Sequence, residues 1–338
     1  MTELPHEETE KAMTRHDPPP LSTHPDTPGQ VPGTTTEPSL ARTTRPRTSA
    51  PLYLFGLLAV YLIAVCTPFG QRAENALLNG VGAEPAWIYD WSGTAYGSAA
   101  LPPLEDTALP TLLVGTAVIV AVALVRRCWW PGFAATGVVV VTFGGTEVLS
   151  KVVLPRPDLV DAPDMLTAVS FPSGHVAIPA GLALAAALVA SPRIRPYVIA
   201  ACMLWLAVTA GAVQALYHHR PSDVLGATLL ACACYSLAAR LLPPADAPDI
   251  TRSPRALPTV ALALSAAGAL AAGARNDSVT QSLVFAAAAF LCAALFWFTA
   301  AEGPVHIARR TRPAVRRPPG GPHAGAGRRL YRPELPHP

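Results

Sequence analysis

A histidine and an aspartate four residues apart form the first group of side chains that could do chemistry. His219 and Asp223 lie in the stretch 217–224, where Pro221 suits the first turn of a helix. The spacing lets the carboxylate accept a hydrogen bond from one imidazole nitrogen and fix the tautomer, which leaves the other nitrogen free as a nucleophile. The alternative is an interfacial His-Asp hydrogen bond without chemistry. His218 lacks the spacing and is predicted to lie behind the reacting groups.

A second group is the turn Phe-Pro-Ser-Gly-His at residues 171–175, which precedes an apolar run. Ser173 suits a helix cap, and Gly174 lets a ligand approach the backbone. Free backbone N–H groups and the helix dipole favour an anion at such a helix start. His175 adds a general acid at the rim, help that is typically worth about 10²–10⁴-fold. Ordinary helix capping is the alternative reading of this turn.

A third group holds the positive charge that an anion needs. Lys151 and Arg156 flank a short run that ends in two prolines, so Arg156 projects from a stiff turn. An ammonium and a guanidinium commonly clamp phosphate oxygens, although both could be snorkelling membrane anchors. Glu147 lies four residues before Lys151 on the same helix face and is predicted to hold it. Arg220, beside His219, is a further candidate for phosphate binding.

The composition assigns these groups to a membrane protein. Of 338 residues, 51% are hydrophobic and only 14% are charged, too few charges to cover an ordinary soluble surface. The net charge of +3 is small and the basic residues lie beside apolar runs, so no nucleic-acid partner is expected. The six cysteines show no C-x-x-C spacing and are predicted to be buried small hydrophobes. No metal site and no cofactor are predicted.

Apolar stretches of suitable length predict an all-α, polytopic membrane helix bundle with about eight spans, since a bilayer-crossing helix needs roughly 20 residues. The predicted spans cover residues 51–70, 109–125, 132–150, 176–190, 196–216, 224–242, 256–272 and 283–301. The chain then divides into a disordered tail at 1–50, a first span with a polar loop at 51–108, motif-bearing spans at 109–243, two additional spans at 244–301 and a disordered Arg- and Pro-rich tail at 302–338.

The arginines predict which ends of the spans are cytoplasmic, because cytoplasmic flanks collect basic residues. With eight spans, one side carries Arg42, Arg45, Arg47, Arg126, Arg127, Arg193, Arg195, Arg252, Arg255, Arg309, Arg310 and Arg312. Both termini are then cytoplasmic, and the three groups lie at the outer ends of spans. The predicted location is a bacterial-type plasma membrane with an extracytoplasmic site. Ionisable groups in a bilayer are costly, which favours a functional role for those that are present.

The three stretches, in this order at the ends of successive spans, resemble the signature of the type 2 phosphatidic acid phosphatase superfamily. The resemblance covers about residues 109–243. It implies a six-helix core and metal-independent hydrolysis of phosphomonoesters or diphosphates through a phosphohistidine. By position it assigns phosphate binding to Lys151, Arg156, Ser173 and Gly174, general acid catalysis to His175, nucleophilic attack to His219 and its orientation to Asp223.

The chain departs from that signature in two places. Four residues separate Lys151 from Arg156, where the family has six. The family's third stretch begins with Ser-Arg, whereas this chain has Ala212 and Val213 there. A charge-assisted contact is worth about 1.5–3 kcal/mol, so its loss in the transition state would slow the reaction by about one to two powers of ten unless Arg220 replaces it.

The sequence therefore predicts a membrane lipid phosphatase that acts at the outer leaflet. Its expected substrate is a polyprenyl diphosphate or phosphatidate, whose chain could enter from the bilayer between spans. The alternative is a non-catalytic binder or transporter of lipid phosphates on the same helices, which the missing arginine motivates. The oligomeric state does not follow from the sequence.

Overall fold

The computed structural model describes residues 49–78, 107–242, 254–274 and 278–301, all within the unit Pro46–Pro338. These residues form helices and connecting turns, with no strand among them. Outside the described residues lie nearly all of the tail 1–50, the tail 302–338 and most of the loop 71–108, together with the arginines of the two tails.

A helix is present in each range predicted to be a span. The helices are α1 (Ser49–Val60), α2 (Pro68–Leu77), α4 (Ala108–Val125), α5 (Trp129–Val148), α6 (Asp164–Thr167), α7 (Gly174–Val189), α8 (Arg195–Ala215), α9 (Pro221–Leu241), α10 (Leu257–Ala272) and α11 (Val279–Ala301), with π-helical turns η1 (Tyr61–Val65) and η3 (Leu149–Val153). Five of them are long and apolar enough to cross a membrane: α4, α5 with η3, α8, α9 and α11. The bent pair α1–α2 would raise this number to six, while α7 and α10 are shorter apolar helices.

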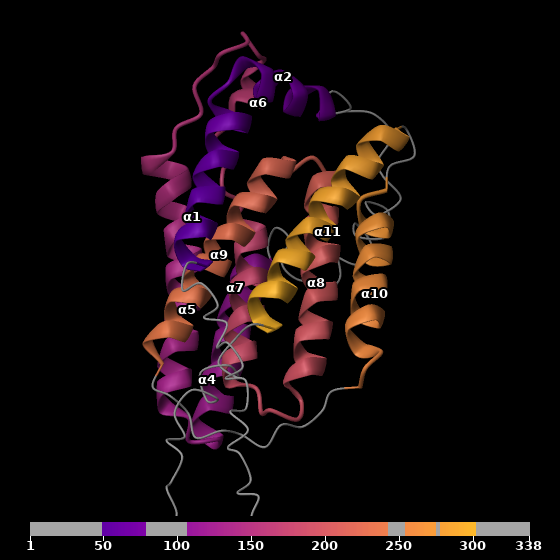
Figure 1. Ribbon diagram of the computed structural model, residues 1–338. Coiled ribbons are helices and arrows are strands. Elements are labelled where there is room, and N and C mark those ends of the chain that lie inside the picture. The colour runs from indigo at the N-terminus through magenta and orange to yellow at the C-terminus, as the bar shows by residue number, and fades with distance from the viewer. Residues whose placement is uncertain (1–48, 79–106, 243–253, 275–277, 302–338) are drawn as a thin grey trace, which may run out of the picture. The chain divides into compact units, whose positions relative to one another are not determined.

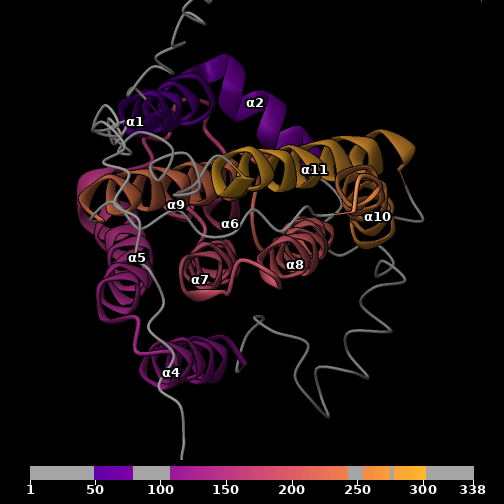
Figure 2. The ribbon, with the colours of Figure 1, turned by 60° about the horizontal axis from the view of Figure 1, so that its bottom comes forward.

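Helix α7 is the centre of the bundle. It packs against α4, α5, α8 and α9, which surround it in Figure 2. An Ala-rich sequence that is apolar on every side suits this position, because small side chains let neighbouring helices approach closely. Its start therefore lies where several helix ends meet.

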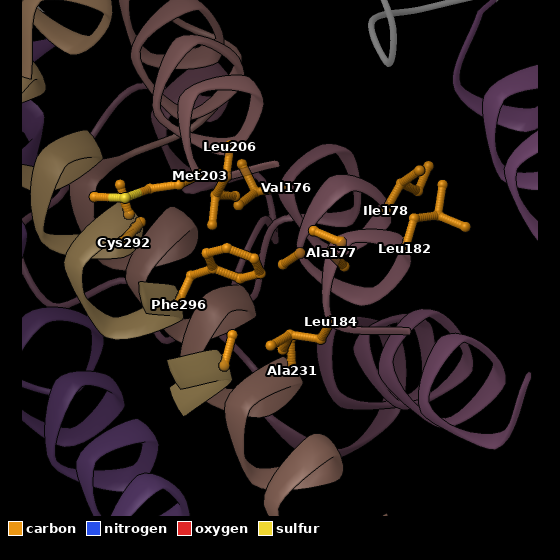
Figure 3. Packing of buried hydrophobic residues seen from close by; sticks show 14 of the residues in the cluster. Val176, Ala177, Ile178, Leu182, Leu184, Met203, Leu206, Ala231, Cys292 and Phe296 are labelled. Atoms are coloured by element: carbon orange, nitrogen blue, oxygen red, sulfur yellow. The ribbon is translucent and has the colours of Figure 1, made fainter. Parts of the chain in front are cut away.

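The two helices that follow α9 belong to the same core. Helix α10 packs against α8 and α11, and α11 packs against α8 and α9. Figure 3 shows Phe296 of α11 among side chains of α7, α8 and α9, while Ile178 and Leu182 of α7 point to the other side. Phe296 is fully buried there. The predicted additional spans thus complete the packing around α8.

The outer faces of the helices are apolar, as lipid contact requires. On α4, Leu113 is 60% exposed and Val118 is 56% exposed, and α5 shows Val140 and Val141 in the same way. A soluble protein rarely leaves so much apolar side-chain surface in water. With the long apolar helices, this surface makes the chain a multi-pass membrane protein.

The first predicted span is broken near its end. Thr67 caps α2 through its Oγ1, which accepts the Gly70 N–H at 3.0 Å, and Pro68 takes the first helical position. Helix α2 consequently turns by 81° from α1 and lies across the end of the bundle (Figure 1). The prediction of a polar loop from residue 71 was wrong for residues 71–77, because the second helix, α2, which begins after the cap at Thr67, continues to Leu77.

One glycine lets the Phe171 turn pack against α9. A Cβ on Gly226 would come within 2.6 Å of the ring of Phe171, which is almost fully buried and stacks 5.5 Å from Tyr61. We expect Gly226→Ala to destabilise the protein by about 1–3 kcal/mol through overpacking. Thermal unfolding in detergent measures the effect. Gly137→Ala is the matched control, since a Cβ on Gly137 meets nothing within 4 Å. Equal unfolding midpoints for the two variants would contradict this account of the turn.

Candidate active site

The structure brings His219, Asp223 and His175 into one row. Asp223 Oδ2 lies 3.5 Å from His219 Nδ1, and His219 Nε2 lies 3.0 Å from His175 Nδ1 with hydrogen-bond geometry. Asp223 is fully buried, while the side chain of His219 is 11% exposed. This arrangement gives His219 a carboxylate on one nitrogen and leaves the other facing the second imidazole.

Backbone contacts hold the starts of α7 and α9 together. Ser173 N donates to the Asp223 carbonyl oxygen at 3.0 Å, and Arg220 N donates to the Asp223 carboxylate at 2.9 Å. Asp223 therefore caps its own helix while it faces His219. The row of side chains follows from two helix starts that are bonded to each other.

Ser173 caps α7 as its sequence predicts. Its Oγ accepts the Val176 N–H at 3.3 Å, and the side chain is fully buried. Glu147 of α5 lies beside the next residue, since its Oε1 is 3.5 Å from the place that a Cβ on Gly174 would take. Gly174 itself adds no side chain at the helix start, and the carboxylate of Glu147 lies within contact distance of its position.

Lys151 and Arg156 occupy different surroundings. Lys151 pairs with Glu147 at 2.5 Å, as the four-residue spacing predicts, and its side chain is 72% exposed. Arg156 is 4% exposed and lies 3.8 Å from a carboxylate oxygen of Glu74. Its two terminal nitrogens have no hydrogen-bond partner. Only Arg156 of this pair is a buried cation with donors free for an anion.

Arg220 is directed to the loop before the Phe171 turn. Its guanidinium donates to Ser170 Oγ at 3.0 Å and to the Leu166 carbonyl oxygen at 2.6 Å. The side chain is 4% exposed. Arg220 therefore fixes the loop that leads into Ser173, and its Nε has no hydrogen-bond partner.

The remaining sequence candidates lie close by. The ring of His218 is 6.2 Å from that of His175, which places it beside the row. Val213 occupies the position of the family's third-motif arginine, and its side chain is fully buried in the apolar core. Its carbonyl oxygen accepts the N–H groups of both His218 and His219, at 2.9 and 3.2 Å. This position supports the turn but adds no charge.

Sequence reasoning missed two polar residues on α2. Glu74 Oε1 accepts the Ser222 N–H at 3.1 Å, and Gln71 Nε2 donates to the Pro157 carbonyl oxygen at 2.5 Å. Burial raises the pKa of Glu74 to about 7, with a further rise from the charge of Asp223, against the lowering effects of Ser222 and Arg156. Gln71 and Glu74 are three residues apart, so they lie on one face of α2, and this spacing was the only sign in the sequence that they act together. The sequence does not show which surface that face covers.

Within the described residues, no group of three or more His, Cys, Asp or Glu side chains could hold a metal ion. The chemistry available at this site comes from imidazole, carboxylate and guanidinium groups and from the start of α7. Such a set can bind a phosphate group and offer it a nitrogen nucleophile.

No curated protein and no solved structure matches the chain. A family model does match, and the matched segment contains every site residue above except those on α2. Residues 129–246 match the model of the PAP2 superfamily, which bears out the resemblance of this segment to the type 2 phosphatidic acid phosphatases.

Proposed function

We propose that the protein is a membrane phosphatase that hydrolyses a phosphomonoester or diphosphate of a lipid through a phosphohistidine. The observation that carries the proposal is the row Asp223, His219, His175 at the capped start of α7, inside the segment that matches the PAP2 superfamily. A phosphate group at that helix start would lie beside a nucleophile and a proton donor at once.

In the first step, Nε2 of His219 attacks phosphorus while Asp223 stabilises the positive charge that develops on the ring. The P–O bond to the lipid breaks, and the departing oxygen takes a proton from His175. Arg156 and the N–H groups at the start of α7 stabilise the charge on the phosphoryl oxygens. In the second step, water attacks phosphorus and gives its proton to His175, the N–P bond breaks with its electron pair returning to Nε2 of His219, and orthophosphate leaves.

The imidazoles of His175 and His219 contact each other directly. Their facing nitrogens are in hydrogen-bond contact at 3.0 Å, so a phosphoryl group must separate them to lie between nucleophile and acid. That contact also keeps the attacking nitrogen occupied until substrate arrives.

We further propose eight spans, with both termini in the cytoplasm and the site at the extracytoplasmic face of a bacterial plasma membrane. The arginine pattern supports this orientation. Arg126, at the end of α4, donates to the Val189 carbonyl oxygen at the end of α7, whereas His175 lies at the start of α7. The basic flank and the site are therefore at opposite ends of the same helix.

The test is orthophosphate release by purified protein in detergent. Polyprenyl diphosphates, polyprenyl phosphates and phosphatidates form the panel, each assayed with and without a chelator. The proposal expects release from at least one lipid class, unchanged by the chelator. Absence of release from every member would reject the phosphatase function, and loss of activity with the chelator would reject the metal-independent mechanism.

Lys151 is expected to contribute little, in contrast to Arg156. An exposed ion pair is typically worth about 0.2–1 kcal/mol, so Lys151→Ala should lower kcat/KM by less than about fivefold. Arg156→Ala removes a buried charge-assisted contact and should lower kcat/KM by about 10- to 150-fold. Steady-state kinetics on one lipid phosphate compares them. A larger loss for Lys151→Ala than for Arg156→Ala would reverse the assignment of the phosphate-binding cation.

A second candidate is a non-catalytic binder or transporter of lipid phosphates. Val213 favours it, because a buried apolar side chain stands where the family has a charged one. Lipid binding that survives in His219→Ala, without turnover in either protein, would support this candidate over the phosphatase.

A further inference from the structure

Helices α1 and α2, which precede the segment that matches the family, hold the chain on both sides of Arg156. The Tyr61 hydroxyl donates to the Pro155 carbonyl oxygen at 2.7 Å. Gln71 donates to the Pro157 carbonyl oxygen at 2.5 Å and accepts the Leu159 N–H at 3.1 Å. The position of Arg156 is therefore set by α2 and by the turn that leads into it.

Glu74 faces Arg156 from the same side of α2 as Gln71. The two side chains are 9% and 4% exposed, and Glu74 Oε2 lies 3.8 Å from Arg156 Nη1. Neither of these two atoms makes a hydrogen bond. The pair is thus held by charge without hydrogen bonds, and the donors of the guanidinium remain available to another anion.

The other oxygen of Glu74 takes part in the start of α9. It accepts the Ser222 N–H at 3.1 Å, next to Asp223, which accepts the Arg220 N–H. The charged groups that face Glu74 are therefore Arg156 from the loop after η3 and Asp223 and Arg220 from the start of α9. Two carboxylates and two guanidinium groups share this buried region.

A buried guanidinium without a counter-charge is costly, because its desolvation is not repaid. Bound phosphate would repay it, but between turnovers another anion must neutralise the guanidinium. Given the proposed phosphatase function, we infer that Glu74 is the resident counterion of Arg156, a positioning residue that holds the arginine between turnovers and weakens its binding of phosphate. The negative charge of Glu74 repels the phosphate that Arg156 attracts, which speeds release of the product.

The test measures how strongly orthophosphate inhibits the hydrolysis of a lipid phosphate by wild type and by Glu74→Gln. Glutamine keeps the size and the acceptor for the Ser222 N–H but removes the charge. At pH 8 the inhibition constant should fall about tenfold in Glu74→Gln, the effect of removing one unit charge near an anion in partly screened surroundings. Glu74→Asp should stay near wild type. Arg72→Gln, an exposed charge change on the same helix, is the matched control.

The difference should also depend on pH. The pKa of Glu74 is raised to about 7, so the carboxylate is charged above that pH and neutral below it. The ratio of inhibition constants between wild type and Glu74→Gln should therefore shrink from pH 8 to pH 6. The titration of orthophosphate itself cancels in this ratio, because the same solution is used for both proteins. A purely structural role for Glu74 would give weaker binding at every pH.

Equal or weaker orthophosphate binding in Glu74→Gln would overturn the inference. Binding is also measured without turnover, as the rise in unfolding temperature that orthophosphate causes in detergent. If wild type binds orthophosphate but turns over no lipid, the phosphatase function is rejected. The orthophosphate affinities of wild type and Glu74→Gln then still test the role of Glu74. Wild type that does not bind orthophosphate rejects both proposals.

Discussion

His219→Ala is expected to abolish phosphate release, with a loss of at least about 10³-fold in kcat on the best lipid substrate, because it removes the nitrogen on which the proposed covalent intermediate forms. His175 contacts the attacking nitrogen of His219, and the ring of His218 lies beside that of His175. Wild type stopped during turnover of a phosphorus-labelled lipid should carry the label in an alkali-stable bond, as phosphohistidine does. His219→Ala should carry none.

His218→Ala is the control for this experiment. It removes an imidazole one residue away and should still form the labelled intermediate, whatever its rate. Label on His219→Ala, or equal rates for wild type and His219→Ala on every lipid phosphate, would show that His219 is not the nucleophile. A change confined to the unfolding temperature would mean that the residue serves only the fold.

The helices were predictable because apolar runs near the length of a bilayer leave few alternatives to a helix. Local polar contacts were predictable for a related reason. The Lys151–Glu147 pair spans four residues within one helical stretch, so helix geometry brings these groups together. The cap at Ser173 and the approach of Asp223 to His219 are likewise local, since each joins a residue just before a helix to one in its first turn. The roles of these residues in catalysis stay predictions.

Contacts distant in sequence were not predictable. The pairing of Glu74 with Arg156 and Ser222 depends on the 81° turn before α2. The cap at Thr67 determines where α2 begins but not the direction in which it runs. The direction of Arg220 depends equally on Leu166 and Ser170, which lie 54 and 50 residues earlier in the chain. Such contacts come from packing of whole helices, for which the sequence gives no local sign.

The charge around Asp223, His219 and His175 affects how tightly the site binds phosphate and how fast it releases it. Val213 adds no cation, and the terminal nitrogens of Arg220 are bonded to the loop, whereas both terminal nitrogens of Arg156 lack a hydrogen-bond partner. Glu74 offsets part of that charge. We therefore expect a site that binds phosphate weakly and releases it readily, rather than one that holds its product.

His175→Ala is expected to slow the hydrolysis of alkyl lipid phosphates by about 10²–10⁴-fold, because the leaving oxygen then departs without a proton. An aryl phosphate with an acidic phenol needs no such proton, so its first step should survive in His175→Ala. The second step still lacks the base that activates water. The variant should therefore release about one phenol per protein in a burst and then stall as the phosphohistidine, the pattern of an accumulating covalent intermediate.

Stopped-flow absorbance of the phenol measures the burst, and His219→Ala, which should show none, is its control. Equal losses on alkyl and aryl substrates without a burst would mean that His175 orients His219 through their 3.0 Å contact instead of transferring protons. The comparison separates the two roles because only proton transfer depends on the acidity of the leaving group. Orientation of the nucleophile affects every substrate alike.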